Sequence, residues 1–591
     1  MYSASAVKPD WHRSKLHSVK KIFAALTIAV LSLAALTACS TGGVQAGSVI
    51  RVGLLNDFNS INADNVTADG ALETNQEVAA LTVPSFYYVE ADETLVANQE
   101  FGTVTVVSKQ PYQVRYTLTG AAEWSDGQKV TANDLLLSWL AARNPLDAGF
   151  NSSRTGSGLK WATSVPVVSS DLKSLTVTFD HPVADYRTAL TVNAAAHIVA
   201  QKAFGTTENT SALARFSLAV STANLEDQKL LAEKYAELYL ARNLGTLAPK
   251  VGAGPYLVTA YSEGKSLTLK ANSNFTWGPL PKIETVEIKF LSDSTTMMAA
   301  LQANQIDIAS PRESGIATVS DLVALAKTTG SVLEVGGSHS AEAIMLNFGE
   351  GSVFSSAGND VTKVTAVRSA FLKMVPIAKI LTALSADSPV IEAKSWIYSS
   401  KSNYYTPFVE ANGSASFTVQ NAELAQELLK QSKIRTPVEV RVLYDQNNPR
   451  AKAEFNLLNQ YAGSVGFNLI DVSSRNPREI YTTGEFDVYI SIVALAGEVG
   501  GDPYWFTGSS VTKFVDPALD ALLGDLSGKA EAIDQVATLK KIDTQLYSAQ
   551  FGLPLYQVPS MLAYGKKVKS VVASPVGASA TYGYWNWVVS N

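Results

Sequence analysis

The sequence predicts an α/β protein with mixed sheets in more than one domain. Segments with the two-residue alternation of strands and segments with helical spacing follow one another without strict βα alternation. Hydrophobic residues make up 46% and charged residues 17% of the 591 residues, which is typical of a globular chain and not of a disordered one. At roughly 100–200 residues per domain, the chain should form two to four folding units.

The N-terminus has the pattern of a signal peptide. Residues 1–21 carry five basic side chains against one acid, and Ile22 to Leu36 form an uncharged apolar run. The run is shorter than the ~20 apolar residues that a transmembrane helix needs. It ends in Leu36-Thr37-Ala38-Cys39, which resembles the bacterial lipobox, where the cysteine is diacylated and becomes the first residue after cleavage. The alternative is an ordinary cleavage site that lies beside a cysteine by chance.

We therefore expect residues 1–38 to be removed and Cys39 to carry the lipid. Two acyl chains give stable anchoring, so the protein should be tethered to the extracytoplasmic face of the bacterial cell membrane. Residues 39–48 are mostly small and predict a flexible tether. No later segment reaches membrane-spanning length, so we expect a soluble body on this tether.

Cys39 is the only cysteine, which excludes disulfides within the chain and leaves no thiolate for catalysis or metal binding. Removal of residues 1–38 leaves 42 basic and 52 acidic residues. Nucleic acid is not an expected partner, because phosphate binding needs a basic surface.

Alternating or short apolar runs bounded by turn residues predict the strands. In chain order they are Val49–Leu55, Gly102–Val107, Gln113–Thr119, Leu172–Phe179, Leu257–Tyr261, Ser266–Lys270, Thr285–Phe290, Val438–Tyr444, Leu553–Gln557 and Thr581–Val589. Helical spacing and caps predict Asp134–Ala142 (after a cap at Thr131 or Asn133), Leu225–Arg242, Met297–Ala303, Val361–Leu381, Glu423–Leu429 and Arg450–Val465. Residues 143–160 are a loop by composition.

The chain carries no complete motif of an enzyme or of a cofactor site. Glu263-Gly264-Lys265-Ser266 ends like a phosphate loop, but Thr259 stands where the first glycine is required. The chain has no Gly-x-Ser-x-Gly and no His-Glu-x-x-His, and His181, His197 and His339 are far apart and predicted to be surface or capping residues. We therefore expect no enzyme, no cofactor and no metal; a glycosidase carboxylate pair is a weak hypothesis that stays open.

Residues 123–134 read EWSDGQKVTAND and resemble the W-x-D-G-x-x-(V/L)-T-A-x-D signature of family 5 extracellular solute-binding proteins. These are the oligopeptide-, dipeptide- and nickel-binding components of ABC importers. Further matches follow in the family's order over roughly residues 49–590: Gly252–Tyr256 (G-T-G-P-Y), Leu301–Ile308 (L-x-x-G-E-I-D, with Asn304 for glycine), Val367–Phe371 (V-R-x-A-F), Gly501–Phe506 (G-D-P-x-x-F) and Leu553–Leu555.

The resemblance implies a two-lobed periplasmic-binding-protein-like fold of type II, the Venus-flytrap type, with an extra subdomain in lobe I. We expect lobe I over 49–290 with the subdomain at roughly 85–165, lobe II over 291–553, and a return to lobe I over 554–591. The two crossover strands are expected near Glu287–Leu291 and Leu553–Gln557. Trp124 should be core, and Gly252–Pro255 should form a tight backbone crossing.

The family's peptide binders pair the ligand main chain with protein backbone from both lobes and fix its α-ammonium with a carboxylate. By this resemblance Asp502 is the candidate for the ammonium, although it could instead only cap a Gly-Asp-Pro turn; Glu498 is a weaker candidate. The remaining cleft candidates, several of which could equally be core, are Tyr504, Trp505, Tyr87, Tyr88, Tyr444, Asn447, Asn56 and Asn59.

The expected function is that of a monomeric lipoprotein that captures oligopeptides between two lobes and delivers them to an ABC permease and its ATPase. The chain lacks the tryptophan common before the G-D-P match and a clear arginine for a peptide carboxylate, with Arg450 the one candidate. An alternative is therefore a non-transport cell-envelope lipoprotein that binds a glycolipid or a protein partner. A secreted hydrolase is a remote third hypothesis.

Overall fold

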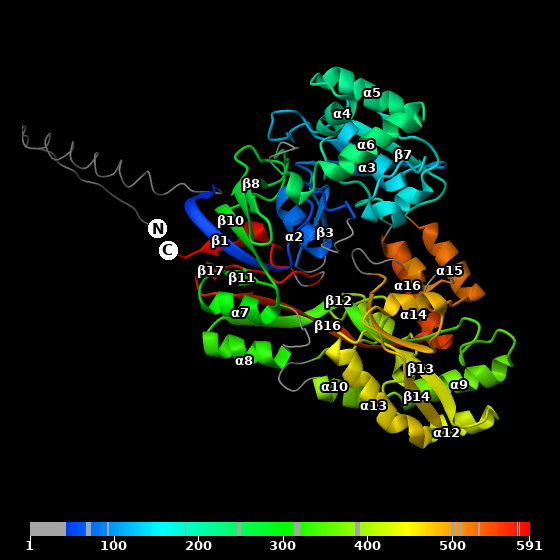
Figure 1. Ribbon diagram of the computed structural model, residues 1–591. Coiled ribbons are helices and arrows are strands. Elements are labelled where there is room, and N and C mark those ends of the chain that lie inside the picture. Colours follow the sequence, from blue (N-terminus) through cyan, green and yellow to red (C-terminus); the bar gives the residue numbers. More distant parts are fainter. Residues whose placement is uncertain are drawn as a thin grey trace, which may run out of the picture. The chain divides into compact units, whose positions relative to one another are not determined.

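The structure is a computed structural model of the chain, which Figure 1 shows. It describes residues 43–66, 72–91, 94–183, 185–244, 250–311, 319–384, 390–497, 503–507, 511–529, 532–575, 577 and 579–590. The chain divides into Met1–Val44 and Gln45–Asn591, and the second unit is the folded body of the protein.

A ten-stranded sheet forms the frame of this unit, in the order β14-β13-β15-β12-β16-β11-β1-β10-β9-β8. It is mixed, since β1 runs parallel to β10 and β11 whereas β12 runs antiparallel to β15 and β16. The predicted α/β class with mixed sheets is therefore confirmed. The strands are β1 (Gln45–Leu55), β8 (Tyr256–Ser262), β9 (Ser266–Ala271), β10 (Ile283–Leu291), β11 (Ile308–Ala309), β12 (Val332–Leu346), β13 (Val438–Leu443), β14 (Phe467–Asp471), β15 (Val488–Ala494) and β16 (Gly552–Tyr564).

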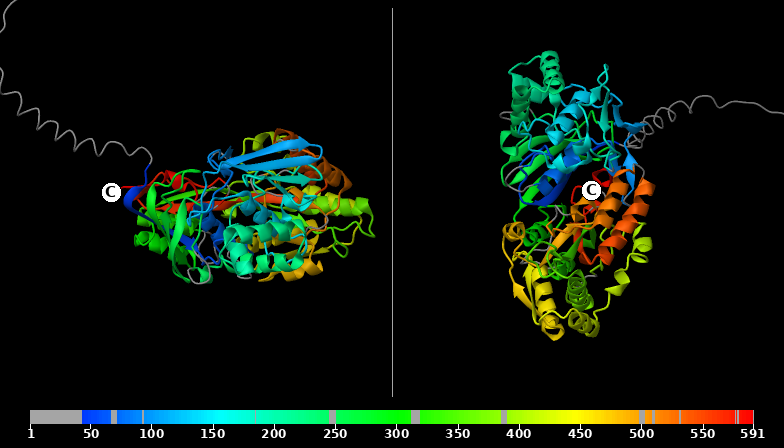
Figure 2. Two further views of the ribbon diagram at one scale, coloured as in Figure 1. Left: turned by 90° about the horizontal axis from the view of Figure 1, so that it is seen from above. Right: turned by 90° about the vertical axis from the view of Figure 1, so that its right-hand side faces the viewer.

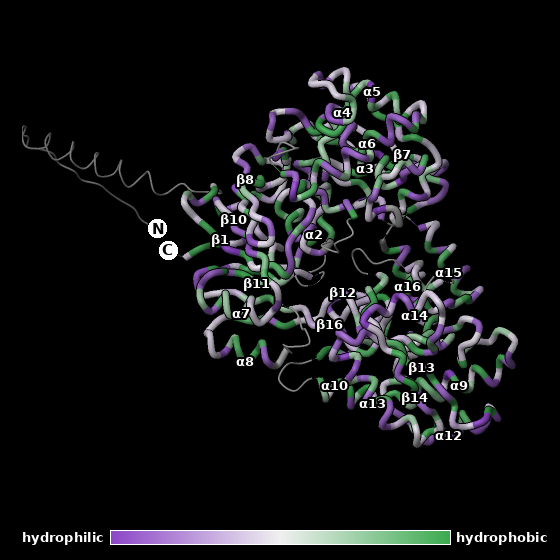
Figure 3. Tube along the Cα trace, viewed as in Figure 1, coloured by the Kyte–Doolittle hydropathy of each residue, from purple (hydrophilic) through white to green (hydrophobic). Residues whose placement is uncertain are grey.

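Separate apolar cores define two lobes around this sheet. Among the described residues, those between Ala341 and Tyr556 share one core and form lobe II. Those from Ile50 to Val335 and from Met561 to Val589 contribute to three core clusters and form lobe I. In Figure 3 the apolar segments of β13 and β14 lie inside lobe II. The helices of lobe II are α9 (Val361–Met374), α10 (Ile377–Leu384), α11 (Tyr405–Val409), α12 (Ala422–Gln431), α13 (Pro449–Val465), α14 (Pro477–Thr483), α15 (Pro517–Ser527) and α16 (Ala532–Ser548).

Lobe I includes a second sheet, ordered β4-β5-β7-β6. The apolar core beside this sheet has members from Phe86 to Trp277, so the inserted subdomain reaches beyond the expected residues 85–165. The strands of this sheet are β4 (Gly102–Lys109), β5 (Tyr112–Leu118), β6 (Val167–Val168) and β7 (Ser174–Phe179), and the small pairs β2 (Tyr87–Val89) with β3 (Leu95–Ala97) and β17 (Val568–Lys569) with β18 (Val588–Val589) accompany it. The helices of lobe I are α2 (Leu72–Thr82), α3 (Ala132–Arg143), α4 (Ala196–Phe204), α5 (Asn209–Ser221), α6 (Leu225–Glu237), α7 (Ser294–Gln302) and α8 (Val319–Thr329).

The strands that cross between the lobes are β12 and β16, which pair along most of their length. Figure 2 shows these long strands running lengthwise through the molecule. The first crossover was expected at Glu287–Leu291, but β10 pairs with β1 and β9 inside lobe I. Helices α7 and α8 also stay in lobe I, because Met297, Met298 and Leu322 pack with Met561 of β16 in one core cluster. The chain therefore enters lobe II about 45 residues later than 291, at the β12 crossing.

The crossing point is a bulge. Gly337 pairs with Pro559 and Ala341 with Gln557, so residues 338–340 lie opposite the single residue Val558. A bulge interrupts the ladder and bends the strand. The hinge thus consists of residues 337–341 and 557–559.

Several local predictions are corrected by the structure. The helix expected over Val361–Leu381 is two helices, because Pro376 cannot continue the hydrogen-bond ladder of α9. The strand expected over Thr581–Val589 is wrong except for Val588–Val589, since Tyr584–Asn586 form a turn of 3-10 helix. Residues 45–48, which were expected to belong to the tether, are instead part of β1, because the Gln45 N–H donates to Lys282 O in the first ladder position of that strand.

Three of the predicted signatures, at residues 123–134, 252–256 and 301–308, lie in the scaffold. Ser125 N donates to Gly252 O at 2.9 Å, which joins the first signature to the Gly252–Tyr256 crossing, and Trp124 is buried as predicted. Asp307 accepts two bonds from the Arg51 guanidinium, at 2.8 and 2.9 Å, and so ties β1 to β11. Asn304 has φ +53°, a left-handed conformation that glycine adopts freely and asparagine tolerates. This explains why asparagine can replace the glycine of the family pattern.

Gly254 provides a sharp test of the predicted backbone crossing. A Cβ there would lie 2.1 Å from Thr82 C and 2.3 Å from Thr82 O, whereas at Gly252 it would meet only a Leu257 methyl at 3.1 Å. Because backbone cannot move aside cheaply, we expect Gly254→Ala to lower the free energy of unfolding by roughly 2–3 kcal/mol, as overpacking does. Gly252→Ala is the matched control and should cost clearly less. Urea unfolding followed by circular dichroism measures both; equal losses would refute a backbone clash.

Candidate functional site

An open cavity of about 570 Å³ lies between the lobes at the hinge. Helix α2 and the segment after residue 573 form its lobe I wall, and α13, β15 and the hinge strands form the opposite wall. The residues that line it are Glu73, Gln76, Glu77, Ala80, Ser338, Ser340, Arg450, Ile492, Val558, Pro559, Ser574, Gly577, Ser579 and Tyr582. We call it the cleft cavity.

A second cavity of about 220 Å³ continues along β16 past the bulge. It shares Ser574, Gly577 and Ser579 with the cleft cavity, and its remaining wall includes Glu334, Lys401 and Ser560. The two cavities therefore adjoin across the C-terminal segment.

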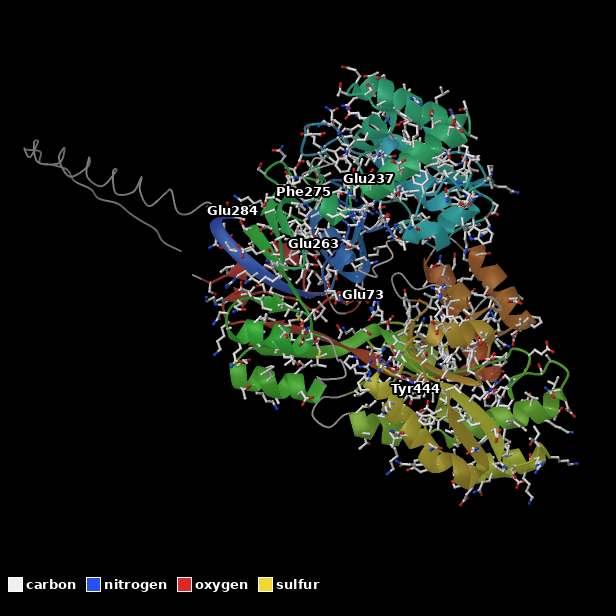
Figure 4. All side chains as sticks on the ribbon, in the orientation of Figure 1. Glu73, Glu237, Glu263, Phe275, Glu284 and Tyr444 are labelled. Carbon is white, nitrogen blue, oxygen red and sulfur yellow. The ribbon has the colours of Figure 1, made fainter. Side chains whose placement is uncertain are left out.

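Helix α2 and the C-terminal segment are fastened to each other on the lobe I side. Glu77 Oε2 accepts hydrogen bonds from Ser579 Oγ at 2.9 Å, from Thr581 Oγ1 at 2.6 Å and from Thr581 N at 3.1 Å. Figure 4 shows Glu73, one turn earlier on α2, at the side of lobe I that faces lobe II. The wall is thus acidic and held in a fixed position.

The lobe II wall contains an open sheet edge. Leu495 N donates to His339 O, and because bonding alternates along an antiparallel ladder, Ile492 and Ala494 direct their N–H and C=O groups away from β12. On that other side β13 pairs with β15 only at Val488 and Tyr489. Ile492 is 47% exposed and lines the cleft cavity. Beyond Tyr489, the backbone groups of Ile492 and Ala494 on that side of β15 therefore pair with no strand among the described residues, beside the cleft cavity that Ile492 lines.

A buried charge network supports the lobe II wall. Asn448 Nδ2 donates to Glu342 Oε1 at 2.9 Å, and Arg450 Nε donates to Glu342 Oε2 at 3.3 Å. The Tyr556 hydroxyl donates to Glu454 Oε1 at 2.5 Å. Glu342 and Glu454 are both fully buried, on β12 and α13. The network connects the hinge strands to the residue of lobe II that carries a positive charge into the cavity.

The two carboxyl groups of this network differ in protonation. Burial raises the pKa of Glu454 well above its ordinary value, and the charge of Glu342 raises it further. Burial also raises the pKa of Glu342, but Arg450 and Asn448 oppose that rise. We therefore assign the proton to Glu454 and the negative charge to Glu342, which leaves one buried anion for one buried cation.

Residues 103–514 match the family model of bacterial extracellular solute-binding proteins, family 5 Middle. The chain belongs to this family. It is similar to a lipoprotein of Mycobacterium leprae, ML0489 (23% identity over 98% of this chain and all of the relative), and to the oligopeptide-binding protein OppA of Mycobacterium tuberculosis (23% identity, 93% of this chain and 91% of the relative).

Solved structures share the fold. The periplasmic EDTA-binding protein EppA superposes with a TM-score of 0.74 at 18% identity, over 93% of this chain and 98% of that chain. The oligopeptide-binding protein AppA of Bacillus subtilis, in complex with a nonapeptide, gives 0.64 at 13% identity, over 93% of this chain and all of that chain. The predicted two-lobed type II fold is confirmed.

Three predicted positions lie outside the described residues: Asp502, Glu498 and the lipidation site Cys39. Tyr504 lies in the 3-10 turn Pro503–Phe506, where the structure describes its backbone but not its side chain. Trp505 packs against the lobe II core, with its ring 4.2 Å from that of Phe506.

The structure places the other predicted site residues away from the cavity lining. Tyr444 is in the core of lobe II, stacked on Phe455, and its hydroxyl donates to Asp471; Figure 4 shows it inside that lobe. Tyr87 packs on the lobe I core and the Tyr88 ring contacts Trp585.

The three predicted asparagines also lie away from the cavity lining. Asn447 is an exposed turn residue, and Asn56 is exposed with φ +64°. Asn59 is fixed to α2 by two hydrogen bonds with the side chain of Asn75.

Sequence reasoning missed α2, the hinge serines, Ile492 and the C-terminal segment as site elements. The interruption of a strand by Gly336-Gly337 was a usable signal, since paired glycines in a strand mark a bulge. The histidine prediction was also wrong at His197, which is buried and lies 2.8 Å from Asp126 Oδ2 through Nε2.

Metal-binding clusters and membrane-spanning helices are both absent from the part of the chain that the structure describes. Within it, no cluster of three or more histidine, cysteine or acidic side chains could ligate a metal ion. No helix there is both long and apolar enough to span a membrane.

The proton on Glu454 predicts a pH dependence of stability. The unfolded side chain loses its proton near pH ~4.3, whereas the folded one keeps it to higher pH, so stability should fall as pH rises from 5 to 8. Glu454→Gln keeps an acceptor for Tyr556 and removes the titration. The free energy of unfolding of Glu454→Gln should therefore increase relative to that of the wild type by up to about 1 kcal/mol per pH unit between pH 5 and 8.

The measurement is urea unfolding at pH 5, 6, 7 and 8. Glu342→Gln is the contrasting variant. It leaves Arg450 without its buried counter-ion, so its free energy of unfolding should be ~3–5 kcal/mol lower than that of the wild type. Parallel pH profiles of the wild type and Glu454→Gln would contradict the assignment of the proton.

Proposed function

We propose that this protein captures peptides between its lobes and delivers them to an ABC permease with its ATPase. The observation that carries the proposal is the open end of β15 beside the cleft cavity. An extended peptide can add to such an edge through its main chain, which gives affinity that is tolerant of side chains. The similarity to OppA and to the AppA–nonapeptide complex supports peptides as the solute.

Closure of the lobes at the hinge would bury the bound peptide. The bulge between Gly337 and Ala341 is where the paired strands can bend with least loss of ladder hydrogen bonds. Asp502, at the G-D-P position, remains our candidate for the peptide ammonium, with Glu498 second.

Ile492 tests the sheet edge. Ile492→Lys places a flexible charge beside the unpaired backbone, and we expect it to weaken peptide binding about tenfold or more, or ~1.4 kcal/mol. Ile533→Lys is the matched control, because Ile533 is also an exposed lobe II isoleucine but lies on α16, outside the cavity lining. Mass spectrometry of peptides that each variant retains from a casein digest, followed by calorimetry with a retained peptide, gives the comparison.

Two further arms of this experiment use modified forms of the retained peptide. N-methylation at alternate residues should abolish binding in one register and spare it in the other, as strand pairing requires. Acetylation of the amino terminus should weaken binding to the wild type but not to Asp502→Asn. Binding that ignores N-methylation at every position would exclude main-chain pairing, and binding that ignores acetylation would exclude the ammonium role.

We also propose that the chain is exported and held on the membrane by lipid on Cys39, in agreement with the lipoprotein relative. Cys39→Ala should move the protein from the membrane fraction to the culture medium or periplasm without changing its melting temperature, because residues 45 onward form the folded body. Cell fractionation and immunoblotting measure this. Full retention of Cys39→Ala in the membrane fraction would contradict lipid anchoring.

A further inference from the structure

The hinge end of the cleft is lined by hydroxyl groups. The cleft cavity and the second cavity together have five serines in their walls, and these come from three separate parts of the chain: Ser338 and Ser340 in the β12 bulge, Ser560 on β16, and Ser574 and Ser579 in the C-terminal segment. The bulge gathers them, because it turns residues 338–340 out of the ladder beside β16. We call this group the serine subsite.

Ser574 is the most informative member of the subsite. It lines both cavities and is only 3% exposed, and among the described residues its hydroxyl has no hydrogen-bond partner. A buried hydroxyl without a partner destabilises the protein that carries it. Because the hydroxyl oxygen itself is buried, Ser574 reaches a bound molecule only by rotation of its side chain into the cavity that it lines, and the molecule then supplies the missing partner.

Part of the subsite is ordered before any solute enters. Glu77 Oε2 takes three hydrogen bonds from Ser579 and Thr581, and the Tyr582 hydroxyl donates to Val89 O at 3.0 Å. A site that is already ordered loses little entropy on binding. Ser579, on the lobe I side of the subsite, is therefore held in place by α2.

Most charged groups around the subsite are already engaged within the protein. Glu77 holds the C-terminal segment, Glu334 accepts from the Tyr564 hydroxyl at 2.8 Å, and Arg450 is bonded to Glu342. Lys401 and Glu73 are exposed, and water weakens such charges. Two of the five serine hydroxyls are engaged as well, since Ser338 Oγ donates to Ser340 O and Ser579 Oγ donates to Glu77. The hydroxyls of Ser340, Ser560 and Ser574 remain as contacts that can both donate and accept.

We infer that the serine subsite binds an uncharged polyhydroxylated group of the captured solute, such as a sugar ring or polyol. This rests on the proposed capture of a solute in the same cleft and defines the chemistry of one end of that solute. Each hydroxyl of the ring both donates and accepts, as do Ser574 and its neighbours. The peptide portion would then lie toward Ile492 and the β15 edge.

The test uses three probes that differ in charge on one pyranose ring: glucose, glucuronate and glucosamine, supplemented by ribitol and inositol. Saturation-transfer NMR and titration on the full protein at millimolar probe should show binding of at least one neutral probe, with glucuronate and glucosamine several-fold weaker. A tenfold preference for either charged probe, or no neutral probe bound, would overturn the inference.

Ser574→Ala should reduce binding of the neutral probe about tenfold while leaving the melting temperature of the unliganded protein equal or higher, because an unpartnered hydroxyl is removed. Ser414→Ala is the matched control: Ser414 is also 3% exposed with an unpartnered hydroxyl among the described residues, but it lines neither cavity. Ser414→Ala should change the melting temperature in the same way as Ser574→Ala and leave binding of the neutral probe unchanged. Unchanged probe binding by Ser574→Ala would refute the role of this serine.

The outcome is separable from that of the proposed function. If casein peptides bind through the β15 edge but no neutral probe binds, the serine subsite fails alone. If neutral probes bind and no peptide is retained, peptide capture fails and the serine subsite stands.

Discussion

The pairing of β12 with β16 across both lobes is the constraint on which the rest of the structure depends. Each strand belongs to both lobes, so the lobes cannot separate without breaking a ladder that extends from Val332 to Met345. The ladder is irregular at two places: inside lobe II between Glu342 and Ala343, opposite Leu555, and at residues 338–340, opposite Val558. The second of these lies at the crossing between the lobes, where relative movement can concentrate. The same interruption releases serine side chains and backbone groups for contact with a solute, so the hinge and the binding surface share residues.

The buried charges of lobe II follow from this position. Glu342 lies on β12 directly after the hinge, and it fixes Arg450 at the first turn of α13, where the side chain reaches the cavity wall. One partly buried arginine stands beside two buried carboxyl groups, and burial together with the charge of Glu342 raises the pKa of Glu454 well above its ordinary value, which favours its neutral form beside Tyr556. The network costs stability, as such networks do, and in return it fixes the geometry of one cleft wall.

The fold was largely predictable because its signatures are local in sequence and have direct structural duties. The W-S-D-G turn and the Gly252–Tyr256 segment meet through Ser125 and Gly252, and Asp307 ties β11 to β1 through Arg51. The capping box of α3, with Thr131 and Asp134 bonded reciprocally, is also readable from the chain. The lobe boundary was not predictable from the sequence. Whether α7 and α8 pack in lobe I or join the following lobe depends on long-range apolar contacts, such as those of Met297 and Met561 in one core cluster.

The sequence by itself determined the α/β class, the family, the acidic balance of the chain and the N-terminal pattern of an exported lipoprotein, since each depends on composition or on short motifs. Only the tertiary structure decided which residues face the cleft. Tyr444 looked like a cleft residue and is core, whereas Ser574, Glu77 and Ile492 carry no local signal and line the cavity. The reason is geometric: a cleft between lobes is assembled from segments about 500 residues apart, such as α2 and the C-terminal segment, and no local pattern records which of them will meet.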